Sequence, residues 1–236
     1  MHHLLRKQIG ILFVSLAFLS NAHAQYKQLY RENHDDMPYY FGMTLAYNTS
    51  YLAATKNTRF TQYDSIMSVE PGASGGIALG LLATLKLNDF YELRVNPQLI
   101  IGGSKYFTYI TNYPIRVEKK TLPSTIVSFP IHFKFNSDRL NNFRTYLLGG
   151  VKFDMDLASN SAARNAEDLV KLKKNDFALE AGIGFNFYLP FVTVSPEIKF
   201  SYGLTNIHSR DPNLKYSNVL EKLQSRMITI SLHLED

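Results

Sequence analysis

Near its C-terminal end the chain reads Met227-Ile228-Thr229-Ile230-Ser231-Leu232-His233-Leu234, in which apolar and polar side chains alternate. This period of two residues predicts a β-strand with one apolar and one polar face. The same alternation recurs seven more times between Tyr39 and this segment. Strands of roughly ten residues repeated in this way are typical of a transmembrane β-barrel, with an apolar face toward lipid and a polar face toward the lumen. Because an open sheet edge in hydrocarbon would leave backbone groups without hydrogen-bond partners, the strands are expected to form a closed ring.

The spacing of the segments supports this count. Strands are predicted at residues 39–48, 74–85, 91–107, 127–135, 143–156, 177–189, 192–202 and 227–234. Long connections (51–73, 108–124, 157–176 and 205–226) alternate with short ones (86–90, 136–142 and 190–191). The sequence therefore predicts an all-β protein, an eight-stranded antiparallel transmembrane β-barrel with long extracellular loops and short periplasmic turns. A soluble sandwich or lipocalin-like barrel has no reason to alternate its connections so regularly.

The two faces of the predicted strands differ in chemistry. Apolar side chains such as Leu93, Phe133, Ile183 and Ile198 are expected to contact lipid. The groups expected to point into the lumen are Glu92, Arg94, His132, Lys134, Arg144, Lys152, Asp154, Glu180, Glu197 and Lys199. Charges removed from bulk water need partners, so these groups are interpreted as an ion-paired network that plugs a narrow barrel. The alternative is a catalytic set, as in small outer-membrane acyltransferases and proteases, but the predicted strand ends do not bring a Ser, a His and an Asp together.

Aromatic side chains gather near the predicted strand ends. They are Tyr39, Tyr40, Phe41, Phe90, Tyr91, Tyr106, Phe107, Tyr109, Phe143, Phe177, Tyr188 and Phe191. Their number and placement favour the aromatic girdle of a membrane barrel. Ordinary β-propensity would explain any single one of them.

The first residues have the features of a cleavable export signal. Arg6 and Lys7 precede an apolar stretch, and small residues at Ala22 and Ala24 predict cleavage before Gln25. The apolar stretch is too short for a membrane helix, so a retained anchor is the weaker interpretation. The predicted organisation is a signal peptide at 1–24, a periplasmic arm at 25–38 and an outer-membrane barrel domain at 39–236. The arm is polar and unpatterned, which favours a flexible tether, with simple disorder as the alternative.

Composition disfavours several classes of site. The chain has no cysteine, which excludes disulfides, thiolate metal sites and a lipidated cysteine. His34, His132, His208 and His233 lack the spacing that would bring two imidazoles to one metal. Glycine pairs such as Gly149-Gly150 lie within strand patterns, which favours bends over phosphate loops. We therefore expect no catalytic, cofactor-binding or metal-binding residue and no nucleic-acid partner, and identify no small-molecule substrate.

Two of the long connections are candidate binding surfaces. Asn218 stands three residues before Glu221, a spacing that predicts a capped short helix through Leu223. Residues 162–174 also have weak helical character. Solvent exposure alone is the default for such loops.

Several segments carry a resemblance to a known family. They are residues 41–50 (FGMTLAYNTS), 94–99 (RVNPQL), 128–134 (SFPIHFK), 146–151 (YLLGGV) and 195–204 (SPEIKFSYGL). Together they resemble the outer-membrane β-barrel family that is widespread in Bacteroidetes. Within that family, residues 153–160 (FDMDLASN) resemble the PorT (SprT) branch. The C-terminal Leu234-Glu235-Asp236 departs from the aromatic residue on which many barrels end.

The resemblance implies a non-enzymatic outer-membrane component required for type IX protein secretion. That system exports folded cargo with a C-terminal signal and serves gliding motility in species that glide. The implied partners are outer-membrane lipid and other type IX components, with no cofactor and no active-site motif to carry over. Because side chains fill an eight-stranded barrel, an accessory or assembly role is expected rather than that of the conduit. The alternatives are a barrel enzyme that acts on lipid and a surface adhesin that uses its long loops.

Overall fold

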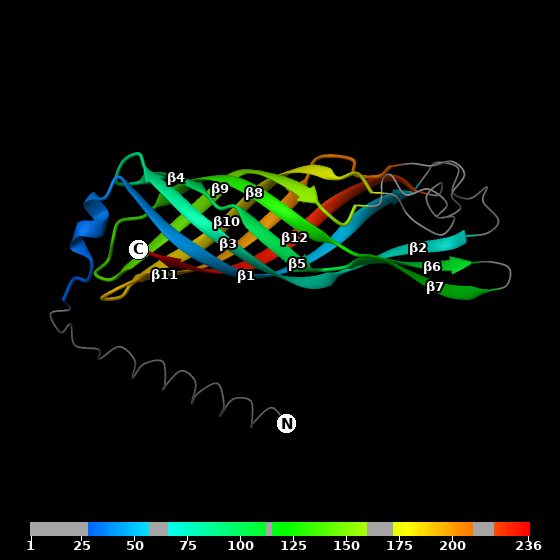
Figure 1. Cartoon of the computed structure of the whole chain (residues 1–236), viewed down its shortest axis with the longest axis horizontal. Helices are drawn as coiled ribbons and strands as arrows, with labels where there is room; N and C mark the ends of the chain where they lie inside the picture. Colours follow the sequence, from blue (N-terminus) through cyan, green and yellow to red (C-terminus); the bar gives the residue numbers. More distant parts are fainter. Residues whose placement is uncertain (1–27, 57–65, 112–114, 160–171, 210–219) are drawn as a thin grey trace, which may run out of the picture.

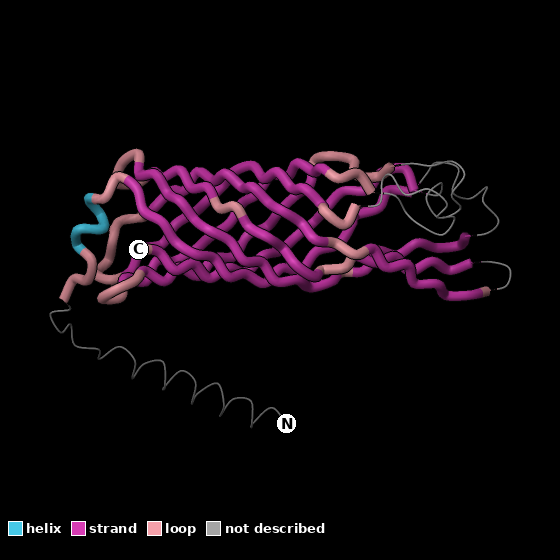
Figure 2. Tube along the Cα trace, viewed as in Figure 1, coloured by secondary structure: helices cyan, strands magenta, loops and turns pink. Residues whose placement is uncertain are grey.

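The computed structural model describes residues 28–56, 66–111, 115–159, 172–209 and 220–236. The predicted signal peptide lies outside these residues. Figures 1 and 2 show a long barrel of oblique strands, with a short helix at the end that carries the C-terminus and a small second sheet at the opposite end. Among the described residues, no helix is long and apolar enough to cross a membrane.

The predicted barrel is confirmed. Nine antiparallel strands form one sheet in the order β1-β12-β11-β10-β9-β8-β4-β3-β5, and the additional pairs β1–β3 and β8–β5 close it into a ring. β4 and β5 both lie between β3 and β8, so they share one position and the ring has eight. The ring strands are β1 (Tyr39–Lys56), β3 (Ser74–Lys86), β4 (Tyr91–Val95), β5 (Gln98–Gly102), β8 (Thr125–Asn136), β9 (Phe143–Asp156), β10 (Asn175–Tyr188), β11 (Thr193–Gly203) and β12 (Leu220–Glu235).

The third predicted strand, at 91–107, is not continuous. Pro97 separates β4 from β5, because proline has no N–H to donate to a neighbouring strand. Its carbonyl oxygen still accepts a hydrogen bond from the backbone N–H of Leu81 at 3.0 Å. Gly102 and Gly103 then adopt φ angles of 83° and 73°, which other residues disfavour. These two glycines lead the chain out of the ring and into β6.

Most of a second sheet lies in the first two long connections, where loops were predicted, and its residues 105–107 lie at the end of the predicted strand 91–107. It consists of β2 (Ile66–Gly72), β6 (Lys105–Thr111) and β7 (Arg116–Leu122) in the order β2-β6-β7, and we call it the cap sheet. Strands β1 and β12 also run further toward this end than predicted. The helix predicted through Leu223 is wrong, because Leu220–Leu223 belongs to β12 and pairs with β1.

A hydrophobic core joins the cap sheet to the end of the ring. It contains Leu52, Val69, Phe107, Tyr109, Leu122, Leu172, Ile207, Leu220 and Leu223, and we call it the cap core. Phe107 and Tyr109 are fully buried in it, so their assignment to the aromatic girdle was wrong. Beyond the bilayer these rings gain by leaving water, and they therefore turn inward.

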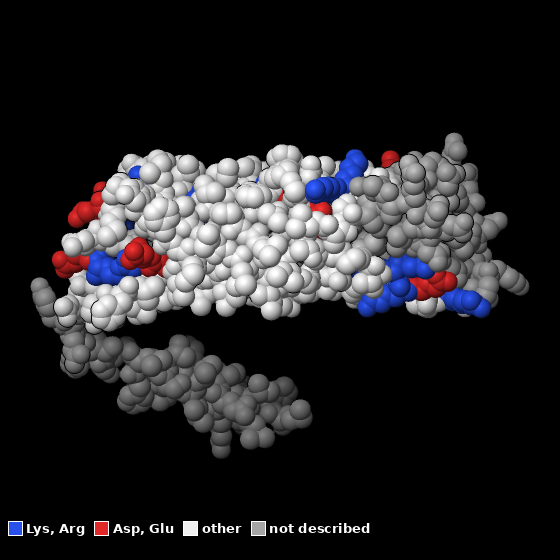
Figure 3. Space-filling view, viewed as in Figure 1, with Lys and Arg blue, Asp and Glu red and all other residues white. Residues whose placement is uncertain are grey.

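The predicted facing of the ring strands is confirmed. Phe133, Ile183 and Ile198 point outward and are 48%, 42% and 36% exposed, while Leu93 is half-buried. The view in Figure 3 shows a broad central surface almost free of charged side chains, which gather at the two ends of the barrel. Such a band is what a lipid-facing wall requires.

The prediction of an aromatic girdle is confirmed in part. Its exposed members are Tyr39, Phe41, Phe90, Tyr91, Phe177 and Phe191, while Tyr106 and Phe143 are half-buried. Tyr40 and Tyr188 are buried instead, at 4% and 2% exposure. Tyr40 follows an outward residue in a strand and must therefore face the lumen.

Candidate functional site

All ten charged and imidazole groups predicted to face the lumen are buried. At their centre Arg94, which is 1% exposed, bridges two carboxylates from other strands. Its Nη1 lies 3.0 Å from Glu197 Oε2, and its Nη2 lies 2.7 Å from Glu235 Oε1. A guanidinium presents its donors in a fixed fork, which suits two acceptors at once.

Further ion pairs surround this bridge. Lys134 Nζ lies 3.1 Å from Glu92 Oε2, and the Tyr40 hydroxyl donates to the same oxygen at 2.8 Å. Lys199 Nζ lies 2.9 Å from Glu197 Oε1. Each of these cations therefore has a carboxylate partner, as the plug interpretation requires.

A second group of ion pairs lies closer to the cap sheet. Lys152 Nζ contacts Asp154 Oδ2 at 3.1 Å and Glu180 Oε1 at 3.4 Å. The other oxygen of Glu180 lies 2.7 Å from His132 Nε2. The ion pairs thus span the six ring strands β4, β8, β9, β10, β11 and β12 and fill the lumen with paired groups.

Two members of the network were not predicted. Glu235 and His233 are both fully buried, and they bind Arg94 and Glu197 respectively. Both stand on the inward side of the alternation that starts at Met227. Extending that period to the last residues would have found them.

Three lumenal side chains form a hydroxyl–imidazole–carboxylate chain. Thr44 Oγ1 lies 2.8 Å from His233 Nδ1, and His233 Nε2 lies 3.2 Å from Glu197 Oε1. A nucleophile, a base and an orienting acid would need this order of contacts. All three residues are at most 3% exposed, and Glu197 is already bound by Arg94 and Lys199. We therefore interpret this chain of contacts as part of the ion-paired network that fills the lumen. It leaves no room for a substrate.

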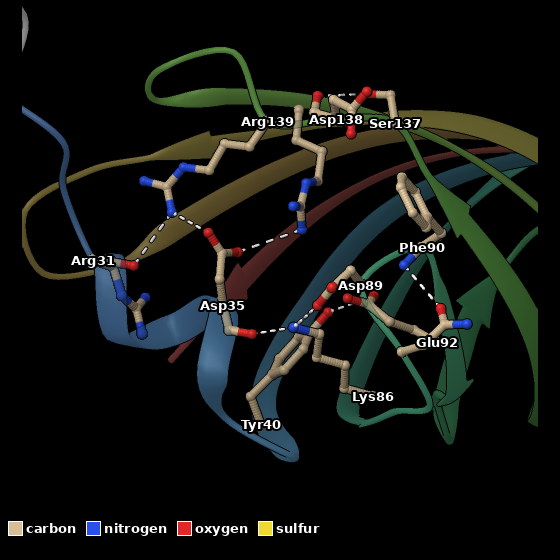
Figure 4. Close-up of polar contacts among 12 residues, drawn as sticks. Arg31, Asp35, Tyr40, Lys86, Asp89, Phe90, Glu92, Ser137, Asp138 and Arg139 are labelled. Carbon is tan, nitrogen blue, oxygen red and sulfur yellow. Dashed lines mark hydrogen bonds and ion pairs between the residues drawn. The ribbon is translucent and has the colours of Figure 1, made fainter.

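One end of the barrel is covered by the predicted arm. Its described part, residues 28–37, contains the 3-10 helix η2 (Glu32–Asp36), and we call these residues the lid. Asp35 is the main anchor, because its carboxylate accepts from Arg139 at 2.8 Å and from Arg144 at 3.4 Å. Its carbonyl oxygen accepts from Lys86 Nζ, as Figure 4 shows.

Other contacts hold the lid at the opposite edge. Arg31 Nη1 donates to the carbonyl oxygen of Glu235 at 2.8 Å, and its Nη2 lies 3.4 Å from Asp236 Oδ1. The side chain of Asn142, in the same turn as Arg139, binds the first residues of the lid: its Oδ1 accepts from Tyr30 N at 2.8 Å and its Nδ2 donates to Gln28 O at 2.8 Å. The expectation of a flexible tether is therefore wrong for these residues. The partners of the lid lie at least 51 residues away in the chain, which local sequence does not reveal.

His34 inserts from the lid into the mouth of the barrel. Its ring centroid lies 4.7 Å from that of Tyr40 and 5.9 Å from that of Tyr188. The Cζ of Arg139 lies 3.8 Å from the centre of the same Tyr188 ring, a cation–π contact. Burial lowers the pKa of His34, and the charge of Arg31 lowers it further. The neutral imidazole is therefore the form that closes the lid.

The opposite end of the lumen is covered by the cap core. Beneath it lies a cavity of only about 20 Å³, lined by groups that include Lys105, Asp154, Asp176 and Ser225. Ser225 donates to Asp176 there. Over the described ranges, no group of three or more His, Asp or Glu side chains is arranged to hold a metal ion. The barrel is thus filled along its length and covered at both ends.

This arrangement fits a known family. Residues 25–209 match the family described as outer membrane protein beta-barrel domain. The chain belongs to this family. Its members lie in the outer membrane of Gram-negative bacteria, and the protein is an outer-membrane β-barrel. The C-terminus and the short turns then lie on the periplasmic side with the lid, and the cap sheet lies outside the cell.

Solved structures of other outer-membrane barrels are similar in fold. OprG from Pseudomonas aeruginosa is 16% identical, with 84% of this chain and 93% of that chain covered and a TM-score of 0.47. Neisserial surface protein A is 13% identical, with 81% and 95% covered and a TM-score of 0.38. Ail from Yersinia pestis, solved with the heparin analogue sucrose octasulfate, is 11% identical, with 85% and 100% covered and a TM-score of 0.39. No curated protein is significantly similar to this chain in sequence.

Proposed function

We propose that the protein is a non-enzymatic outer-membrane component required for type IX secretion. In this role it supports the export of cargo with a C-terminal signal, and gliding motility in species that glide. The resemblance of residues 153–160 to the PorT (SprT) branch supports this assignment. Other components of the same machine are the proposed partners.

The observation that carries the mechanism is the filled lumen. Arg94 bridges two carboxylates across it, Lys152 binds one carboxylate on its own strand and one on the neighbouring strand, and the lid and the cap core cover its ends. Folded cargo cannot pass through such an interior. The protein then acts through its surfaces, as a scaffold that positions or assembles other components of the machine.

Three surfaces are available for such contacts. They are the cap sheet outside the cell, the lid in the periplasm and the apolar wall within the membrane. The cap sheet carries exposed apolar side chains at Met67 (55%) and Val117 (69%), and Ile115 (74%), directly before β7, is exposed beside them. Exposed apolar groups outside the bilayer suit contact with another protein.

A deletion strain tests the proposal. Without the gene, cargo with a C-terminal signal should accumulate in the periplasm, and the wild-type gene should restore export. A gene that lacks residues 160–171 should restore export poorly, although it retains Leu172 of the cap core. The Glu180→Gln variant should restore it fully, because its effect is confined to the lumen.

The rival functions give different outcomes. Normal export in the deletion strain would refute the proposal. Altered phospholipid or lipid A in that strain, reproduced by His132→Ala and Glu180→Gln, would indicate a lipid enzyme instead. Lost surface adhesion with normal export would indicate an adhesin.

A further inference from the structure

A groove of about 430 Å³ lies on the outer wall of the barrel, near the end that carries the cap sheet. It runs across β1, β12 and β11 in two rows set by the strand register. Arg226 pairs with Tyr51 on one side and Tyr202 on the other. One step closer to the membrane centre, Ile228 pairs with Thr49 and Phe200. The groove therefore has a cationic row above an apolar row.

The guanidinium of Arg226 is held in place. Its Cζ lies 3.4 Å from the centre of the Tyr202 ring, a cation–π contact. Its Nη1 donates to the carbonyl oxygens of Gly203 at 3.1 Å and Ser225 at 2.8 Å, and its Nη2 donates to Gln224 Oε1 at 3.5 Å. A guanidinium has five N–H donors, so donors remain for a ligand. The side chain is preorganised before any ligand arrives.

Arg226 differs in its partners from four other arginines of the described structure. Arg31, Arg94, Arg139 and Arg144 each form an ion pair with a carboxylate. The contacts of Arg226 with the described part of the chain are all to neutral acceptors or to an aromatic ring. Among the described residues no carboxylate pairs with its positive charge, which lies on a wall that faces the membrane.

The position along the barrel indicates the membrane interface. On β12 the outward residues on the periplasmic side of Arg226 are Ile228, Ile230, Leu232 and Leu234, all exposed. Tyr51 and Tyr202, beside Arg226, are 42% and 52% exposed. Exposed tyrosines at the edge of an apolar band mark the level of lipid headgroups. This edge faces the outer leaflet, because the cap sheet lies beyond it.

We propose that this groove binds a phosphorylated lipid of the outer leaflet. The phosphate accepts from the free donors of Arg226, and an acyl chain lies along Phe200 and Ile228. Arginine suits phosphate because its fork of donors matches two phosphate oxygens. A lipid is the occupant, since the apolar row adjoins the cationic row and opens to the bilayer. The site is independent of the proposed role in secretion.

Native mass spectrometry of the purified full-length barrel in detergent micelles tests this site. The probe is a diphosphorylated lipid A, compared with the same lipid after its phosphates have been removed. Wild-type protein should bind the phosphorylated form at least tenfold more tightly. Arg226→Gln should lose most of that preference. Lys119→Gln should keep it, because Lys119 also makes a cation–π contact, at 3.7 Å with Tyr106, but lies outside the groove.

Heat-dependent gel migration shows whether Arg226→Gln folds. If it does not fold, the comparison of the two lipids on wild-type protein still tests whether the groove binds the phosphate. Equal binding of the two lipids to wild-type protein would overturn the proposal. So would an unchanged preference in folded Arg226→Gln protein. An equal loss in both variants would also overturn it, since it would indicate general attraction to basic groups.

Discussion

Replacing Arg94 by methionine should destabilise the barrel by about 3–5 kcal/mol, the usual cost of removing one partner from a buried ion pair. The side chain is 1% exposed and bridges Glu197 and Glu235, which are themselves buried. Methionine fills a similar volume, so the loss comes from the two carboxylates and not from a cavity.

The two carboxylates are affected unequally. Glu197 keeps Lys199 at 2.9 Å and the Tyr146 hydroxyl at 2.8 Å. The side chain of Glu235 has Arg94 as its ion-pair partner in the described structure, and Oε2 of Glu235 has no hydrogen-bond partner there. Most of the cost should therefore arise at Glu235, and neutralising it should recover part of the loss.

Equilibrium unfolding in guanidinium chloride, with the protein in lipid micelles, measures this effect. The Arg94→Met, Glu235→Gln and double variants complete a double-mutant cycle. The double variant should be more stable than the sum of the single losses by roughly 0.5–3 kcal/mol. A loss below about 1 kcal/mol for Arg94→Met, or strict additivity, would refute the ion-paired lumen.

Three further predictions concern the wall, the export signal and the lid. Ile183→Arg should cost ~2–4 kcal/mol on the lipid-facing wall. Leu157→Arg, at an exposed site beyond β9, should cost little; equal losses in the same unfolding assay would contradict the facing of β10. N-terminal sequencing of the mature protein should begin at Gln25, and a start that still contains Leu12 would contradict the export signal. Because burial lowers the pKa of His34, the closed lid should be fully stable above about pH 6.5 and weaken as the pH falls below it. The protection of residues 28–37 against hydrogen exchange, measured relative to the intrinsic exchange rate at each pH, should therefore fall at pH 5 in wild-type protein but not in His34→Gln; an equal fall in both would contradict this role.

Periodicity predicts the wall and the lumen because a strand alternates its faces without regard to distant contacts. That is why the placement of Arg94, Lys134 and Glu197 could be read from sequence. The same rule applied to Tyr40 places it in the lumen, although its neighbours favoured the girdle. Pro97 also carried a readable signal, since it cannot donate to a neighbouring strand.

The cap and the lid could not be predicted in the same way. Outside the bilayer the apolar side is the buried side, so Phe107 and Tyr109 follow the opposite rule from Phe133. The lid depends on Asp35 reaching Arg139, which is 104 residues away in the chain. Such contacts are set by ring closure, which brings distant turns to one end of the barrel.

Planar-bilayer recording tests the sealed scaffold most directly. The purified full-length protein should show no large, stable conductance, because paired charges fill the lumen and the lid and cap core cover its ends. Deletion of residues 28–37 should leave it non-conducting, since the bridges of Arg94 and Lys152 would remain. A stable open channel in the wild-type protein would contradict the sealed lumen and would indicate that the protein functions through its lumen.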